Sequence, residues 1–157
     1  LQREQISPSE KAFAYKMKLD ALEMETIMID CLTSSGEFAQ HKAYLGMKNY
    51  LEEHDGRIGF TAVYSVSGES VPGIMAALRE YHYELPDDVG IMAHSTEQVG
   101  QYYHPALTAV CADLKAEVEA AFTGLAAQLD GHCPAFKTTI PMKIMERASV
   151  RTCNPIN

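Results

Sequence analysis

The chain has 157 residues, of which 46% are hydrophobic and 22% are charged. This composition is close to the average of globular proteins and excludes collagen-like, low-complexity and disordered classes. With 21 acidic and 13 basic residues the net charge is −8, which argues against direct binding to nucleic-acid phosphates. The sequence begins with Leu1 rather than Met and has no signal peptide or membrane span, so we expect a processed, excised or partial cytoplasmic chain.

The first half of the chain is predicted to alternate between helices and strands. Ser7 and Pro8 are a helix-start signal, and His54-Asp55-Gly56 is a helix-stop signal. Apolar spacing of three and four residues indicates helices, and β-branched runs indicate strands. The predicted elements are a helix over residues 10–23, a strand over 26–32, a helix that begins at 34–37 and ends near 54, a strand over 60–66 and a helix over 72–82.

The second half continues the same alternation. Asp113 is a typical N-cap for a long Ala-rich helix, which Asp130-Gly131 ends. Strands that alternate with helices require crossover connections, so we predict an α/β fold with a mostly parallel sheet. The predicted elements are a strand over residues 89–93, a loop or short helix over 96–103, a strand over 106–111, a helix over 113–129 and extended segments over 138–140 and 142–145.

Cysteines, histidines and short motifs give no sign of a metal or a catalytic centre. Cys31, Cys111, Cys133 and Cys153 form no CxxC pair, and the six histidines show no HxH or HExxH spacing. We therefore expect free thiols, no metal and no cofactor. A GxSxG elbow, a phosphate loop and a GxGxxG motif are also missing, so we predict a non-enzyme. A small α/β enzyme or a stand-alone ligand-binding protein stays open as an alternative.

Several segments of the chain occur in an order and spacing that match a known family. They are Thr61-Ala62-Val63-Tyr64, Gly73 with Ala76 and Leu78, Glu84-Leu85-Pro86-Asp87-Asp88-Val89, His104-Pro105-Ala106-Leu107-Thr108-Ala109-Val110, Asp113, and Met142-Lys143-Ile144-Met145-Glu146-Arg147-Ala148-Ser149. On these segments residues 25–149 resemble the later part of the effector-binding core of LacI/GalR-type transcription regulators. The resemblance implies a partial periplasmic-binding-protein-like core that binds a small-molecule effector in a cleft between two subdomains. It also implies a homodimer that reaches DNA only through a headpiece outside this chain.

The resemblance and the strand ends together predict the effector contacts. Ligands of parallel sheets bind at the carboxyl ends of the strands. At these positions the family has Asn-Asp, then an aromatic residue with two Asp, and an aromatic residue after the position of Asp113. The corresponding residues here are Ser67 and Gly68, His94 and Ser95 (followed by Thr96), and Leu114. Because the carboxylates that accept hydrogen bonds from sugar hydroxyls are replaced, we expect common sugars to bind weakly.

Two segments leave questions open. Residues 6–18 also resemble a stretch of ParB-like partition proteins, which leaves a ParB-like DNA-binding remnant open as a further alternative. We therefore divide the chain into an N-terminal helix of uncertain origin over 1–24, a partial effector-binding domain over 25–149 and a polar tail over 150–157. The helix over 113–129 has an apolar face, and the resemblance implies that it belongs to a first subdomain that is mostly missing. We expect this helix either to fold back on the sheet or to pack against a second chain. The apolar face consists of Leu114, Val118, Ala121, Phe122, Leu125 and Leu129.

Overall fold

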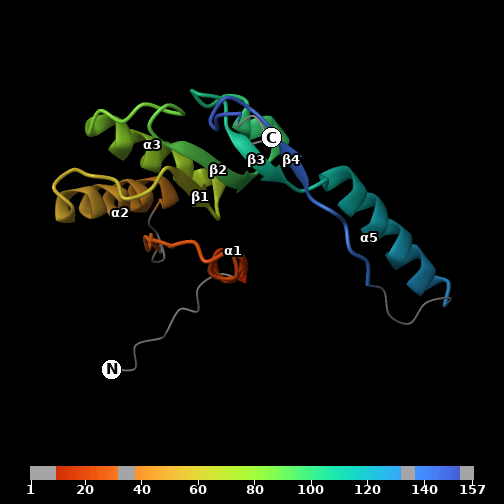
Figure 1. Cartoon of the computed structure of the whole chain (residues 1–157). Coiled ribbons are helices and arrows are strands. Elements are labelled where there is room, and N and C mark those ends of the chain that lie inside the picture. Colours follow the sequence, from red (N-terminus) through yellow and green to blue (C-terminus); the bar gives the residue numbers. More distant parts are fainter. Residues whose placement is uncertain (1–9, 32–37, 132–136, 153–157) are drawn as a thin grey trace, which may run out of the picture.

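The computed structural model describes residues 10–31, 38–131 and 137–152, which fold around a four-stranded sheet (Figure 1). The sheet order is β1-β2-β3-β4; β1, β2 and β3 are parallel, and β4 is antiparallel to β3. The prediction of a mostly parallel α/β sheet is therefore confirmed. The strands are β1 (Ala62–Ser65), β2 (Gly90–Ser95), β3 (Thr108–Cys111) and β4 (Lys143–Met145).

Helices α2 (Ala39–Glu53) and α3 (Val71–Glu80) pack together and cover one face of the sheet. They cross closely at Gly73, where an added Cβ would lie 1.9 Å from the backbone oxygen of Gln40. Only a residue without a side chain permits this distance between the two helices. The buried apolar side chains are Ala43, Met47, Tyr50 and Leu51 from α2, Val71, Ile74, Met75, Ala77 and Leu78 from α3, and Val89, Ile91, Ala93, Leu107, Ala109 and Cys111 from the strands and their flanks.

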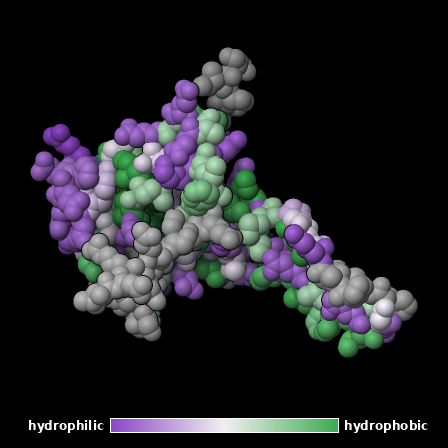
Figure 2. All heavy atoms as spheres, turned by 90° about the horizontal axis from the view of Figure 1, so that it is seen from below, coloured by the Kyte–Doolittle hydropathy of each residue, from purple (hydrophilic) through white to green (hydrophobic). Residues whose placement is uncertain are grey.

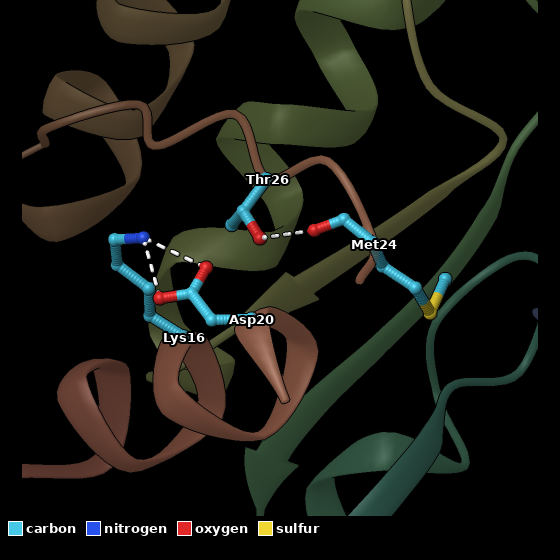
Figure 3. A network of polar contacts seen from close by, with 4 residues as sticks. All are labelled: Lys16, Asp20, Met24 and Thr26. Carbon is cyan, nitrogen blue, oxygen red and sulfur yellow. Dashed lines mark hydrogen bonds and ion pairs between the residues drawn. The ribbon is translucent and has the colours of Figure 1, made fainter. Parts of the chain in front are cut away.

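Helix α1 (Glu10–Asp20) lies against the opposite face of the sheet. Successive side chains of a strand point to opposite faces, and Tyr64 alternates with the buried Ser65. The ring of Tyr15 stacks on that of Tyr64 with 4.6 Å between centroids. Within α1, Lys16 pairs with Asp20 at 2.9 Å (Figure 3). Most residues of the helix are exposed, so few of its side chains pack against the sheet.

Helix α5 (Leu114–Leu129) extends away from the sheet (Figure 1). Its N-terminus is capped as predicted, because the Asp113 carboxylate accepts a hydrogen bond from the Ala116 N–H at 3.1 Å. We call the large side chains along its outer side the apolar stripe. Each is at least half exposed, so the expectation that the helix folds back on the sheet is wrong. The members of the apolar stripe are Leu114 (51%), Val118 (55%), Phe122 (71%), Leu125 (54%) and Leu129 (79%).

Several predicted boundaries need correction. Residues 26–31 form no strand, because they have no strand neighbour to pair with in the described sheet. Strand β2 runs on through Ser95, since it pairs with β3 up to Cys111. Residues 138–140 also form no strand, and the segment at 96–103 contains the short helix α4 (Glu97–Gly100). A 3-10 turn, η1 (Gly68–Ser70), precedes α3. The predicted helix start at 34–37 lies outside the described residues.

Candidate functional site

The carboxyl ends of β1, β2 and β3 meet at one edge of the sheet. Because the strands are parallel and Ser95 pairs with Cys111, the residues that follow each strand lie near one another. A cavity of about 150 Å³ opens at this edge, between the ends of β2 and β3 and the start of α5. Its lining residues are Thr96, Glu97, Gln98, Cys111, Ala112, Asp113, Leu114, Lys115, Lys143 and Met145.

The loop after β1 is held tightly against the end of β2. Gly68 is buried, and an added Cβ would lie 2.5 Å from the Ser95 Oγ. The Tyr103 hydroxyl donates to the carbonyl of Gly68 at 3.1 Å, and the Ser65 hydroxyl donates to the carbonyl of Ser67 at 2.7 Å. The structure therefore brings three predicted contacts together: Ser67, Gly68 and Ser95.

His94 lies on the other face of the sheet, toward α1. Its Nδ1 is 3.3 Å from the Nζ of Lys11, and its Nε2 is buried without a hydrogen-bond partner among the described residues. Burial first, and then the positive charge of Lys11, lower the pKa of His94 below its usual value. The ring is therefore neutral at pH 7 and separated by the sheet from the face that α2 and α3 cover.

Leu114 lines the cavity beside an ion pair that joins α5 to β4. The Nζ of Lys143 lies 2.5 Å from the Asp113 carboxylate. The hydrogen bonds from Lys143 and from the Ala116 N–H lower the pKa of Asp113, and the bond to Asp113 raises the pKa of Lys143. Burial raises the pKa of the Cys111 thiol at the same cavity. Opposite charges are thus paired at the cavity wall, and the thiol stays protonated.

Two polar residues of the cavity lining, Thr96 and Lys143, were not among the predicted effector contacts. Thr96 was placed at a strand end by the sequence, directly after Ser95, but only the structure shows that it lines the cavity. Its hydroxyl also caps α4 by accepting from the Val99 N–H at 3.4 Å. Lys143 comes from an antiparallel strand 30 positions from Asp113, and no local pattern predicts that approach.

The strand ends offer groups that can bind a polar ligand. Hydroxyls of Ser67, Ser95 and Thr96 can donate and accept hydrogen bonds. Of these three residues Thr96 lines the cavity, where Lys143 and Glu97 add charges. Among the described residues, no three His, Cys, Asp or Glu side chains are grouped so as to hold a metal ion. Every helix in the described part of the chain is too short or too polar to cross a membrane. Cys31 and Cys111 are free thiols, whereas Cys133 and Cys153 lie outside the described residues.

A family model described as a periplasmic binding protein-like domain matches residues 2–150, which include α1. No curated protein matches the sequence. A LacI family transcriptional regulator from Arthrobacter, solved in complex with lactose, is 20% identical, with a TM-score of 0.80 over 95% of this chain and 54% of that chain.

Two further solved structures have the same fold. The Escherichia coli transcriptional repressor ascG is 22% identical, with a TM-score of 0.72 over 91% of this chain and 50% of that chain. A LacI family regulator from Enterococcus faecium with bound ribose is 17% identical, with a TM-score of 0.70 over 92% of this chain and 52% of that chain. The present chain therefore spans about half the length of the solved structures it matches.

Proposed function

The chain belongs to the periplasmic binding protein-like domain family, and we propose that it is the later half of the effector-sensing domain of a LacI-type transcription regulator. The observation that carries this proposal is the polar cavity at the carboxyl ends of parallel strands, where ligands of such sheets bind. The proposed effector contacts are Ser67, Gly68, His94, Ser95 and Leu114. Leu114 lines this cavity, whereas the other four lie at the ends of β1 and β2, with His94 on the face toward α1. We propose that they act by hydrogen bonding and contact, without catalysis or a cofactor.

The hydrogen-bonding groups of these residues bear on how strongly a sugar would bind. Serine and threonine hydroxyls form single neutral hydrogen bonds, whereas carboxylates form charge-assisted ones of roughly twice the strength. The structures of two relatives contain lactose and ribose. Since Ser67 and Ser95 stand where a regulator with a sugar effector would present carboxyl or amide groups, we propose that these sugars bind weakly here.

The proposed partners follow from the same assignment. A sensing domain of this type works in the cytoplasm as a homodimer and reaches DNA through a headpiece that these residues do not include. The net charge of −8 supports the view that this chain does not bind an operator by itself.

An NMR titration of the ¹⁵N-labelled chain tests the effector site. The probes are lactose, ribose, sugar phosphates and nucleobases. We expect at least one probe to shift the amide signals of Ser95, Thr96 and Leu114 together, with lactose and ribose among the weakest. The Ser95→Ala variant should respond less than the wild type. Thr61→Ala is the matched control, because Thr61 is exposed just before the amino end of β1. Failure of every probe, or shifts confined to the amino ends of the strands, would contradict the proposal.

A further inference from the structure

The candidate effector cavity lies at the base of α5, which leaves the body of the molecule as an arm (Figure 2). The start of α5 supplies Leu114 and Lys115 to its lining, and the start of α4 supplies Thr96, Glu97 and Gln98. We call these last three residues the α4 wall. Helix α4 has only four residues, and a single helical turn is not stable by itself, because nucleation costs more than one hydrogen bond returns. The α4 wall therefore depends on contacts from outside the helix.

Arg147 supplies such a contact. Its guanidinium donates one hydrogen bond to the carbonyl of Glu97 at 2.9 Å and another to the carbonyl of Leu107 at 2.8 Å. The first carbonyl belongs to the α4 wall, and the second comes directly before β3. Hydrogen bonds from a charged donor are roughly twice as strong as neutral ones, and the planar guanidinium holds its donors in a fixed geometry. One side chain thus ties the α4 wall to the sheet.

The backbone of Arg147 is itself fixed on the sheet. Its N–H donates to the hydroxyl of Thr108 at 2.9 Å, and that hydroxyl donates to the carbonyl of Arg147 at 3.0 Å. Two residues further on, the fully buried Ser149 joins β2 to β3. Its hydroxyl donates to the carbonyl of Ile91 at 2.6 Å and accepts from the Thr108 N–H at 2.8 Å. The guanidinium is therefore presented to α4 from a firmly bonded backbone.

We infer that Arg147 is a positioning residue of the candidate effector site, which fixes the α4 wall against β3 and so sets the shape of the cavity. Arg147 is not one of the described residues that line the cavity, so it acts through α4. The inference rests on the proposed function, because it concerns the same cavity. A side chain late in the chain thereby holds a wall that lies 50 positions earlier in the sequence.

The thiol of Cys111 reports on the position of the α4 wall. Cys111 lines the same cavity and is 3% exposed. Burial raises the pKa of this thiol, whereas the positive charge of Arg147 lowers it, and the thiolate is the form that is alkylated. Loss of the Arg147 charge with the wall in place would therefore slow alkylation. Movement of the wall would expose the thiol and accelerate alkylation, so the two outcomes have opposite signs.

Iodoacetamide alkylation of the full chain, followed by peptide mass spectrometry, makes this measurement. In Arg147→Gln we expect Cys111 to react about tenfold faster than in the wild type, because two charge-assisted hydrogen bonds no longer oppose local opening. Arg147→Lys keeps the charge but has a single amino group in place of the guanidinium, so its rate should lie between these two. Arg151→Gln is the matched control, because it removes the same charge from an exposed pair with Asp87 and should leave the rate unchanged.

The half-buried Cys31 and far-UV circular dichroism show whether each variant keeps its fold. Local movement of the α4 wall accelerates Cys111 alone. A rate for Cys111 in Arg147→Gln at or below that of the wild type would overturn the inference, and so would an equal acceleration of Cys31. Should Arg147→Gln fail to fold, Arg147→Lys carries the test, and a wild-type rate for Cys111 in this variant would overturn the inference.

The titration with lactose, ribose, sugar phosphates and nucleobases tests the link to the effector. A probe that shifts the Thr96 amide signal of the wild type should bind Arg147→Lys about tenfold more weakly, because the site is less well preorganised. An unchanged affinity for that probe would refute the claim that the α4 wall shapes the site. Failure of every probe with the wild type would contradict the proposed function, whereas the alkylation rates, which need no effector, would still decide the role of Arg147.

Discussion

Helices α3 and α5 both carry large apolar side chains, but only α3 buries them. In α3 the large side chains of Val71 and Leu78 are fully buried, whereas in α5 those of Phe122 and Leu129 are more than two-thirds exposed. Helix α3 has α2 and the sheet beside it, while α5 extends away from both. An apolar face therefore predicts that a helix packs against another surface. It does not predict whether that surface belongs to the same chain, because this depends on the rest of the fold.

The largest effects should come from the core, and one of them from widening the α2–α3 contact. In Gly73→Ala the new Cβ meets the backbone of α2, which cannot move aside as a side chain would. We expect the free energy of unfolding to fall by about 3 kcal/mol. Gly90→Ala is the control, because its Cβ would meet no atom closer than 3.7 Å. Urea denaturation followed by circular dichroism measures both, and equal stabilities would show that the two helices are not tightly packed.

Truncation of one leucine in each helix compares the two regions directly. Leu78→Ala leaves a cavity in the core and should cost roughly 2–5 kcal/mol of unfolding free energy. Leu125→Ala removes a half-exposed side chain and should cost less than about 1 kcal/mol. Urea denaturation followed by circular dichroism measures both variants. A loss for Leu125→Ala as large as that for Leu78→Ala would mean that α5 is packed within its own chain.

The smallest expected effect is on the pH dependence of stability, through His94 and its contact with α1. Burial and Lys11 lower the pKa of His94 in the folded state, so His94 becomes protonated at a higher pH in the unfolded chain than in the folded one. Its contribution to the free energy of unfolding is therefore fully present above the unfolded pKa of about 6.5 and is lost as the pH falls toward the folded pKa. His94→Gln should flatten the decrease in Tm between neutral and mildly acidic pH. His41→Gln, at an exposed position of α2, is the control. An unchanged pH profile in His94→Gln would show that the contact with α1 does not form.

Local signals in the sequence predicted the elements that depend on them. The cap at Asp113 and the proline in the first turn of α3 appear where expected. The run over 26–32 has strand composition, but a strand also needs a neighbour, and pairing is not local. The prediction of the site was limited in the same way, because part of it depends on contacts between distant segments. Position at a strand end was enough to predict that Ser67, Gly68 and Ser95 lie near one another. The direction in which His94 points depends on the register of the sheet, and the approach of Lys143 depends on the return of a distant strand.

Hydrogen exchange followed by mass spectrometry tests most directly whether the two regions differ in stability. We predict that the backbone amides of α2, α3 and the strands exchange slowly, because their large apolar side chains are buried. The amides of α5 should exchange much faster, because its large apolar side chains are at least half exposed. Equal protection of α5 and α3 would contradict a core that consists of the sheet with α2 and α3 and leaves α5 outside.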